Sequence, residues 1–141
     1  MNKPEKQLAI ICDIDGTLAH HSERSPYDYS RVGEDTVDVD IRDLVYVMNE
    51  IGTKILLISG REDSCEEATK QWLQVNLVPH HELFMRKSGD HRKDSIVKRE
   101  IFDEYIRDNY LVRFVLDDRD QVVKMWRDLG LKCLQVAEGN F

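Results

Sequence analysis

Two aspartates stand one residue apart at the end of a short apolar run. The run covers residues 8–12, LAIIC, and Asp13-Ile14-Asp15-Gly16-Thr17 follows it directly. A carboxylate can serve as the nucleophile of covalent catalysis, and a neighbouring carboxyl group can transfer the proton. Asp13 is therefore the candidate nucleophile, and Asp15 is the candidate acid that protonates a leaving oxygen. The non-catalytic alternative is an acidic turn in which Gly16 adopts a positive φ.

Polar groups follow two further, mainly apolar segments in the same way. Ser59-Gly60-Arg61 follows residues 54–58, and Asp117-Asp118 follows residues 112–116. Short apolar runs of this kind are typical of buried strands in a parallel sheet. Ligands of open α/β sheets bind outside the carboxyl ends of the strands. The recurrence of reactive groups at three strand ends therefore predicts one shared site.

These groups provide the parts that phosphoryl transfer needs. We expect Ser59 and the Gly60 amide to bind a phosphate oxygen, and Lys98, with Lys93 as second choice, to neutralise the developing charge. Mg²⁺ prefers a few oxygen ligands from carboxylates and substrate. The predicted metal ligands are the acidic residues at the strand ends: Asp13, Asp15 through its backbone carbonyl, Asp118 and its neighbour Asp117. Taken singly, each motif has a structural alternative, such as a simple turn, a helix cap or an exposed Asp94–Lys98 pair.

The elements between these motifs alternate between strands and helices. Helical patterns cover residues 40–51, 64–75, 93–105 and 120–129, and strand patterns cover 8–11, 54–58, 83–85, 112–116 and 133–136. We expect Ser64 and Glu67 to form a capping box. In the third helix we expect the side chains that face inward to be Ile96, Val97, Ile101 and Tyr105. The alternation predicts an α/β, Rossmann-like three-layer sandwich with a mostly parallel sheet of about five strands.

Composition indicates one domain over residues 1–141. The chain has 141 residues, of which 41% are hydrophobic and 33% charged, as in ordinary globular domains. The net charge of −7 argues against a protein that coats long stretches of nucleic acid, although a local site can still bind a few phosphates. Three cysteines without a CxxC pattern argue against a disulfide scaffold or a zinc site. The absence of an evident signal peptide or apolar span predicts a cytoplasmic protein without a membrane contact.

The motifs together resemble those of the haloacid dehalogenase superfamily of phosphatases. The DxDGT pattern at Asp13 resembles its first motif, and Ser59, Lys98 and Asp118 stand where the later motifs are expected. The segments 59–62, 89–98 and 117–127 and the ending QVAEGNF are similar to the phosphatase domain of bacteriophage-type polynucleotide kinase-phosphatase. That resemblance implies a Mg²⁺-dependent phosphoric monoester hydrolase that removes 3′-phosphates from DNA or RNA ends through an aspartyl-phosphate. It also implies that Arg24 and Arg61 contact substrate and that Asp94 and Lys98 are functional.

The segment between Asp15 and the first predicted helix is too short for an independently folded cap. We therefore expect a minimal cap and an open site, which suits a polymer end, with Tyr27 and Tyr29 as possible stacking partners of a terminal base. The chain has no GxxxxGK[ST] motif, so we expect a separate polynucleotide kinase or ligase as partner. The competing hypotheses are a phosphatase of sugars or nucleotides and a catalytically silent module that binds nucleic-acid ends.

Overall fold

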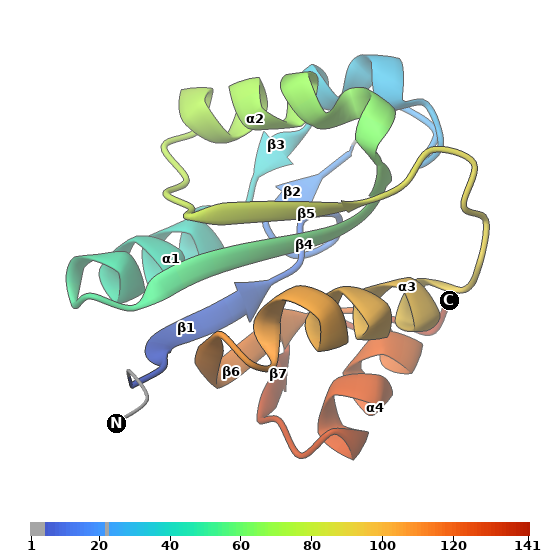
Figure 1. The fold of residues 1–141 in the computed structure, drawn as a ribbon. Helices are drawn as coiled ribbons and strands as arrows, with labels where there is room; N and C mark the ends of the chain where they lie inside the picture. Colours follow the sequence, from blue (N-terminus) through green and yellow to red (C-terminus); the bar gives the residue numbers. More distant parts are fainter. Residues whose placement is uncertain (1–4, 22) are drawn as a thin grey trace.

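A five-stranded parallel sheet forms the centre of the fold. The structure is a computed structural model that describes residues 5–21 and 23–141, and Figure 1 shows its ribbon. The strands pair in the order β5-β4-β1-β6-β7, and every pair is parallel. Their bounds are Gln7–Cys12 (β1), Lys54–Glu62 (β4), Glu82–Arg86 (β5), Tyr110–Asp117 (β6) and Cys133–Gln135 (β7). The expected parallel sheet of five strands is confirmed.

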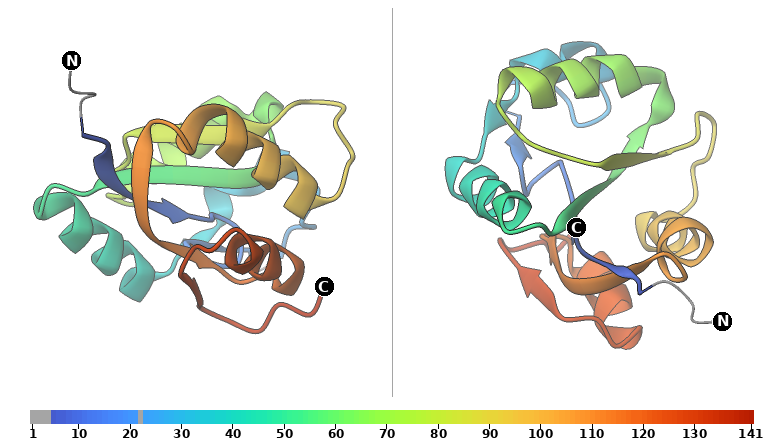
Figure 2. Two further views of the ribbon diagram at one scale, coloured as in Figure 1. Left: turned by 60° about the horizontal axis from the view of Figure 1, so that its bottom comes forward. Right: turned by 60° about the vertical axis from the view of Figure 1, so that its left-hand side comes forward.

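Two helices cover each face of this sheet, which gives three layers (Figure 2). Successive residues of β1 point to opposite faces, as the pleat of a strand requires. Ile10 packs in one cluster with Val45 and Trp72, whereas Ile11 packs in the other with Trp126. The first cluster therefore lies under α1 and α2, and the second lies under α3 and α4. The helices cover Val39–Glu50 (α1), Glu66–Val75 (α2), Asp94–Ile101 (α3) and Asp120–Asp128 (α4).

The strand order places a crevice beside β1. From β1 the chain builds outward to β4 and β5, and it then returns to add β6 and β7 on the other side of β1. The direction of winding thus reverses between β1 and β6. In open α/β sheets the ligand crevice lies outside the carboxyl ends of the strands at such a reversal. Asp13 follows β1 and Asp117 ends β6, so both residues lie at this point.

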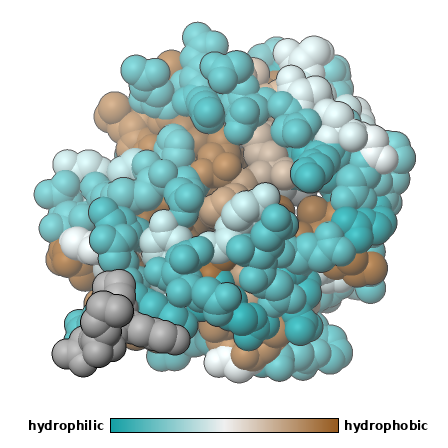
Figure 3. Space-filling model, in the orientation of Figure 1, coloured by the Kyte–Doolittle hydropathy of each residue, from teal (hydrophilic) through white to brown (hydrophobic). Residues whose placement is uncertain are grey.

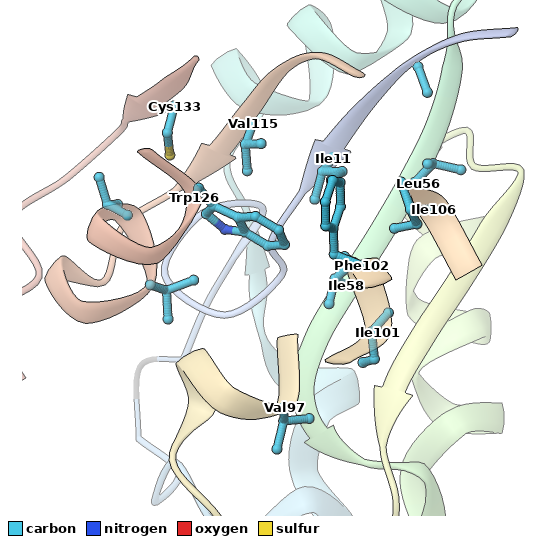
Figure 4. Packing of buried hydrophobic residues seen from close by; sticks show 13 residues of the cluster. Ile11, Leu56, Ile58, Val97, Ile101, Phe102, Ile106, Val115, Trp126 and Cys133 are labelled. Atoms are coloured by element: carbon cyan, nitrogen blue, oxygen red, sulfur yellow. The ribbon is translucent and has the colours of Figure 1, made fainter. Parts of the chain in front are cut away.

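The core under α3 and α4 is organised by an aromatic pair (Figure 4). The rings of Phe102 and Trp126 meet edge to face, with their centroids 5.8 Å apart, which is a favoured geometry for aromatic side chains. The indole Nε1 of Trp126 also donates a hydrogen bond of 3.3 Å to Oδ2 of Asp117. The hydrophobic core therefore fixes the orientation of a carboxylate at the crevice.

The second helix begins later than the sequence predicted. A 3₁₀ turn, η2, covers Asp63–Cys65, and α2 begins at Glu66. Cys65 is the residue that precedes the helix, and no side chain caps it. The prediction of a capping box between Ser64 and Glu67 was therefore wrong, because the extra turn shifts the helix start by two residues.

The third predicted helix is divided into two parts. α3 ends at Ile101, and a π-helical turn, η3, continues over Phe102–Ile106, with Arg107 N bonded to Phe102 O at 2.8 Å. Val97 and Ile101 are buried as predicted, but Ile96 and Tyr105 are exposed. A helix turns by about 100° per residue, so Val97 and its neighbour Ile96 cannot share a face.

The predicted loop over residues 18–38 contains small elements. Two short strands, β2 (Ala19–His20) and β3 (Thr36–Val37), pair antiparallel, and a 3₁₀ helix, η1 (Tyr29–Glu34), lies between them. Trp72 of α2 donates a hydrogen bond of 2.9 Å from its indole to Asp35 O. This bond fixes the small hairpin above the sheet, and the expected minimal cap is confirmed.

The face drawn in Figure 3 is mainly hydrophilic, with a hydrophobic area in its upper part and smaller hydrophobic groups near its edges. Among the described residues, no helix combines the length and the apolar character that crossing a membrane requires.

Candidate active site

Three buried carboxylates converge where β1 and β6 end. One carboxylate oxygen from each of Asp13, Asp117 and Asp118 lies within 4.8 Å of the other two, and all three side chains are buried. They form part of the wall of a cleft of about 1080 Å³. Crowded carboxylates in a dry environment repel one another, so they require a cationic partner. The structure thus brings together three of the four predicted metal ligands.

The ammonium group of Lys98 is that partner within the protein. Its Nζ lies 2.8 Å from Asp13 Oδ1, 3.2 Å from Asp117 Oδ2 and 3.5 Å from Asp94 Oδ2. Burial by itself lowers the pKa of Lys98, but the carboxylates, led by Asp117 and Asp13, outweigh it and hold that pKa well above its usual value. Lys98 therefore stays charged. The structure places Lys98 beside Asp13, whereas Lys93 lies at the amino end of α3.

One lysine does not balance the whole carboxylate cluster. Burial, followed by repulsion from Asp117, raises the pKa of Asp13 well above its ordinary value despite Lys98. Burial and the charge of Asp117 also raise the pKa of Asp118. Such an excess of buried negative charge, offered by carboxylate oxygens alone, is what a hard divalent cation such as Mg²⁺ binds well. The donor set therefore fits a divalent metal.

Gly16 permits the close approach of Asp118 to this cluster. Its φ is +84°, and a Cβ atom there would lie 2.1 Å from Asp118 Oδ2. Both the left-handed backbone and the contact therefore require glycine. Thr17 closes the cluster from the same turn, because its hydroxyl donates to Asp13 Oδ2 at 3.1 Å and lies 3.5 Å from Asp118 Oδ1. The sequence analysis gave Thr17 no role, although its place in DxDGT was visible.

The carboxylate of Asp15 lies apart from the cluster and faces two arginines. Arg61 donates two hydrogen bonds to it, from Nε to Oδ2 at 2.9 Å and from Nη2 to Oδ1 at 2.7 Å. Arg24 adds a longer bond of 3.3 Å to Oδ1. The side chain of Asp15 is 31% exposed, whereas those of both arginines are almost completely buried. This fork orients Asp15 in the cleft, and its predicted metal contact through the backbone carbonyl stays a prediction.

Asp35 completes this arginine pair and was missed by the sequence analysis. Arg24 donates to its carboxylate from Nε at 2.7 Å and Nη2 at 2.8 Å, and Arg61 donates at 2.9 Å. Asp35 is buried and belongs to the polar segment between β2 and β3, where nothing in the sequence separates it from the other acidic residues nearby. Asp35 and Thr69, which accepts from Arg61 Nη1 at 3.1 Å, thus hold the guanidinium groups. That Arg24 and Arg61 contact substrate stays a prediction; Arg61 lines the cleft.

The predicted phosphate-binding segment lies inside a strand and not in a turn. β4 extends to Glu62, because its pairing with β5 resumes at Glu62–Arg86 after an irregularity that follows Ser59. Ser59 is buried, and its hydroxyl accepts a hydrogen bond of 3.0 Å from Arg61 N. Gly60 approaches Asp94 so closely that a Cβ atom would lie 2.5 Å from Asp94 Oδ1. Ser59, Gly60 and Asp94 are therefore neighbours of the site, as predicted from the motifs, while their ligand-binding roles stay predictions.

Arg86 is a further residue that sequence reasoning did not identify. It donates from Nε to Gly60 O at 2.9 Å and from Nη2 to Asp94 Oδ1 at 3.3 Å. The end of β5 is thereby joined to β4 and to the first turn of α3. Because it lies at the end of a short strand without a recognisable motif, only the fold shows its place.

Comparisons with known proteins agree with this arrangement. Residues 7–141 match the family described as the polynucleotide kinase PNKP phosphatase domain. A putative bifunctional polynucleotide kinase/RNA ligase of Autographa californica nuclear polyhedrosis virus is 41% identical over 126 residues, which are 87% of this chain and 18% of that protein.

Two solved structures are similar to this chain over almost its whole length. A chain of the Pnkp1/Rnl/Hen1 complex is 40% identical, with a TM-score of 0.95 over 99% of this chain and 49% of that chain. A chain of the Pnkp1/Rnl/Hen1 RNA repair complex is 41% identical, with a TM-score of 0.94 over 96% of this chain and 44% of that chain. The chain thus spans less than half of each of these relatives. Its sequence and its fold place it in the family of polynucleotide kinase PNKP phosphatase domains.

Proposed function

We propose that this protein is a Mg²⁺-dependent polynucleotide 3′-phosphatase that acts through an aspartyl-phosphate on Asp13. The strongest support is that two carboxylates, those of Asp13 and Asp15, line one cleft but have different surroundings. Asp13 is buried beside Lys98, and Asp15 is partly exposed and held by Arg61. Different surroundings for two carboxylates favour different chemical roles. Membership of the polynucleotide kinase phosphatase family supports a 3′-phosphate end as the substrate.

In the first step, an oxygen of Asp13 attacks phosphorus and the bond from phosphorus to the 3′-oxygen breaks. Asp15, whose carboxyl group is partly exposed to the cleft, gives its proton to the leaving oxygen. Lys98 and Thr17 hold the two oxygens of Asp13 and so aim the nucleophile. The product strand then leaves with a 3′-hydroxyl group.

In the second step, water attacks phosphorus of the aspartyl-phosphate, and Asp15 accepts the proton of that water. The bond from Asp13 to phosphorus breaks, which restores the carboxylate and releases inorganic phosphate. Asp13, Asp117 and Asp118 would hold Mg²⁺, which, when bound, offsets the negative charge shared by phosphate and nucleophile. The arginine fork keeps Asp15 in one orientation through both steps.

The small hairpin β2–β3 leaves room for a polymer end. The cleft has a volume of about 1080 Å³, and the strands of the hairpin are two residues each. An open site accepts the end of a long chain, which a closed cap would exclude. The relatives include a putative bifunctional polynucleotide kinase/RNA ligase and a chain of an RNA repair complex. We therefore propose a role in the repair of nucleic-acid ends together with a polynucleotide kinase or a ligase.

A substrate panel tests this function. Phosphate release is measured with 3′-phosphorylated DNA and RNA oligonucleotides, a 5′-phosphorylated oligonucleotide, a sugar phosphate and a nucleoside monophosphate, each with Mg²⁺ and with excess EDTA. We expect efficient release of phosphate from the 3′-phosphorylated oligonucleotides in Mg²⁺ and no release in excess EDTA. Preference for the sugar phosphate or the mononucleotide would support the small-molecule alternative, and full activity in EDTA would refute the metal site.

A further inference from the structure

Three aromatic side chains line the cleft: Tyr27 and Tyr29, which the sequence analysis named, and Phe141. Phe141 lines the same cleft as Asp13 and Asp118, and 65% of its surface is exposed to solvent. The guanidinium of Arg119 lies over its ring, with Cζ 5.1 Å from the ring centroid. Residue 141 is marked C in Figure 1. The chemistry proposed above does not use this ring.

Backbone contacts fix the position of the segment that carries this ring. A Cβ atom on Gly139 would lie 1.8 Å from Asp118 O, so the segment approaches Asp118 as closely as only glycine allows. Gly139 O accepts a hydrogen bond of 2.9 Å from Asp120 N. Arg119 Nε donates a bond of 2.8 Å to Phe141 O. The backbone of residues 139–141 is thus anchored to residues 118–120, which begin with the candidate metal ligand Asp118.

Arg119 connects this ring to the reacting end of the cleft. Its Nη1 lies 3.7 Å from Asp94 Oδ2, and Asp94 in turn contacts Lys98. One guanidinium therefore lies between the aromatic ring and the charged cluster. Aromatic rings with an adjacent arginine are the usual platform on which unpaired nucleic-acid bases stack.

We propose that Phe141 is a stacking platform for the base of the 3′-terminal nucleotide, with Arg119 as the residue that positions its ring. This inference rests on the proposed 3′-phosphatase function and deepens it by naming how the polymer end is bound. Every base has a π-face, so stacking discriminates weakly between sequences. It does discriminate a nucleotide from a sugar phosphate or a terminal abasic residue. Purines, which have the larger face, should be favoured over pyrimidines at the 3′ end.

The test compares kcat/KM for three substrates in Mg²⁺. These are an oligonucleotide 3′-phosphate with a terminal adenine, the same strand with a terminal abasic residue, and glycerol phosphate. The variants are Phe141→Ala, Phe141→Leu and Phe141→Trp. Tyr46→Ala is the matched control, because Tyr46 is an exposed aromatic on α1 and is not among the residues that line the cleft.

Phe141→Ala and Phe141→Leu should lower kcat/KM about tenfold on the terminal adenine, which is within the range of base stacking, whereas Phe141→Trp should keep it. On the abasic end the same two substitutions should change it less than about twofold. Equal activity of wild type and Phe141→Ala on the adenine end would overturn the inference. So would full activity of Phe141→Leu, which keeps apolar bulk without a π-face.

The failure of the inference is distinguishable from the failure of the proposed function. If the wild-type protein releases no phosphate from either oligonucleotide, the 3′-phosphatase function is wrong. If the wild type is active but Phe141→Ala lowers kcat/KM equally on all three substrates, the function stands. In that case Phe141 acts by holding the segment against Asp118, and the stacking role is refuted.

Discussion

The ammonium group of Lys98 lies 2.8 Å from Asp13 Oδ1, although 85 residues separate the two in the sequence. Both side chains are buried, and the same ammonium contacts Asp117 at the end of β6. The contact joins a helix on one face of the sheet to the ends of its two central strands. The charge of the candidate nucleophile is therefore balanced only when these three elements are assembled.

Replacement of Lys98 by methionine should destabilise the metal-free protein strongly. The substitution keeps much of the apolar stem but leaves the buried carboxylates without their cation, a loss of about 3–5 kcal/mol in the free energy of unfolding. Urea denaturation in EDTA measures it. The control is Lys124→Met, which removes an exposed pair with Asp128 and should change that free energy by less than about 1 kcal/mol. Equal effects of the two substitutions would contradict the account of the cluster.

Asp118→Asn should stabilise the metal-free protein while it abolishes activity. Burial and the charge of Asp117 raise the pKa of Asp118 in the folded state, so folding favours the neutral form. At a pH above this raised pKa, the isosteric amide should give a higher Tm than wild type in EDTA. The difference should shrink as the pH falls toward the ordinary aspartate pKa, where the wild-type side chain becomes protonated.

Addition of Mg²⁺ should reverse this order of stability. The wild-type protein gains stability because the metal binds the folded state, whereas Asp118→Asn lacks a ligand and gains little. Thermal melts with and without Mg²⁺ measure both effects. A wild-type Tm that does not respond to Mg²⁺ would argue against the site.

Gly60→Ala should impair activity through Asp94. The new Cβ atom would lie 2.5 Å from Asp94 Oδ1, so Asp94 and its contact with Lys98 must shift. We expect kcat/KM to fall by about tenfold or more, since small displacements of catalytic groups have large effects. Gly33→Ala is the control, because nothing lies within 4 Å of its new Cβ atom. Comparable losses in the two variants would show that the Asp94 contact is not the cause.

Asp35→Asn should lower kcat/KM although Asp35 itself takes no part in the proposed chemical steps. Its carboxylate accepts hydrogen bonds from both Arg24 and Arg61, and an amide cannot accept all of them. The fork that orients Asp15 should loosen. The effect is measured well below the Tm of the variant, next to Asp128→Asn, which alters an exposed aspartate paired with Lys124. Unchanged kcat/KM in Asp35→Asn would refute the positioning role.

Much of the fold could be predicted because the mainly apolar segments before Asp13, Ser59 and Asp117 are buried where they approach the carboxyl ends of their strands. Those segments placed the carboxylates of Asp13, Asp117 and Asp118 at neighbouring strand ends, and the structure brings them together. The choice between Lys98 and Lys93 could not be made from spacing alone. It depends on which face of α3 meets the sheet.

Asp35, Arg86 and Phe141 were missed because each contacts residues that are distant in the sequence. Asp35 resembles the other acidic residues of its loop in sequence, and only the folded structure shows that it binds Arg61 of β4 together with Arg24 of the same loop. Nothing in the sequence distinguishes Phe141 from the other aromatic residues, and only the fold shows that it lies against Arg119 at the cleft. The wrong prediction of one continuous third helix has a similar cause. The π-helical turn after Ile101 is decided by packing and not by the helical pattern of the sequence.

The central claim is that Asp13 becomes phosphorylated by a 3′-phosphorylated nucleic-acid end. Its most direct test is rapid acid quenching of the protein with a 3′-phosphorylated oligonucleotide and Mg²⁺, followed by mass spectrometry of the peptide that contains Asp13. We predict a phosphate adduct on Asp13 that forms and decays with turnover, and neither adduct nor phosphate release in Asp13→Asn. Near-normal phosphate release by Asp13→Asn would contradict the mechanism.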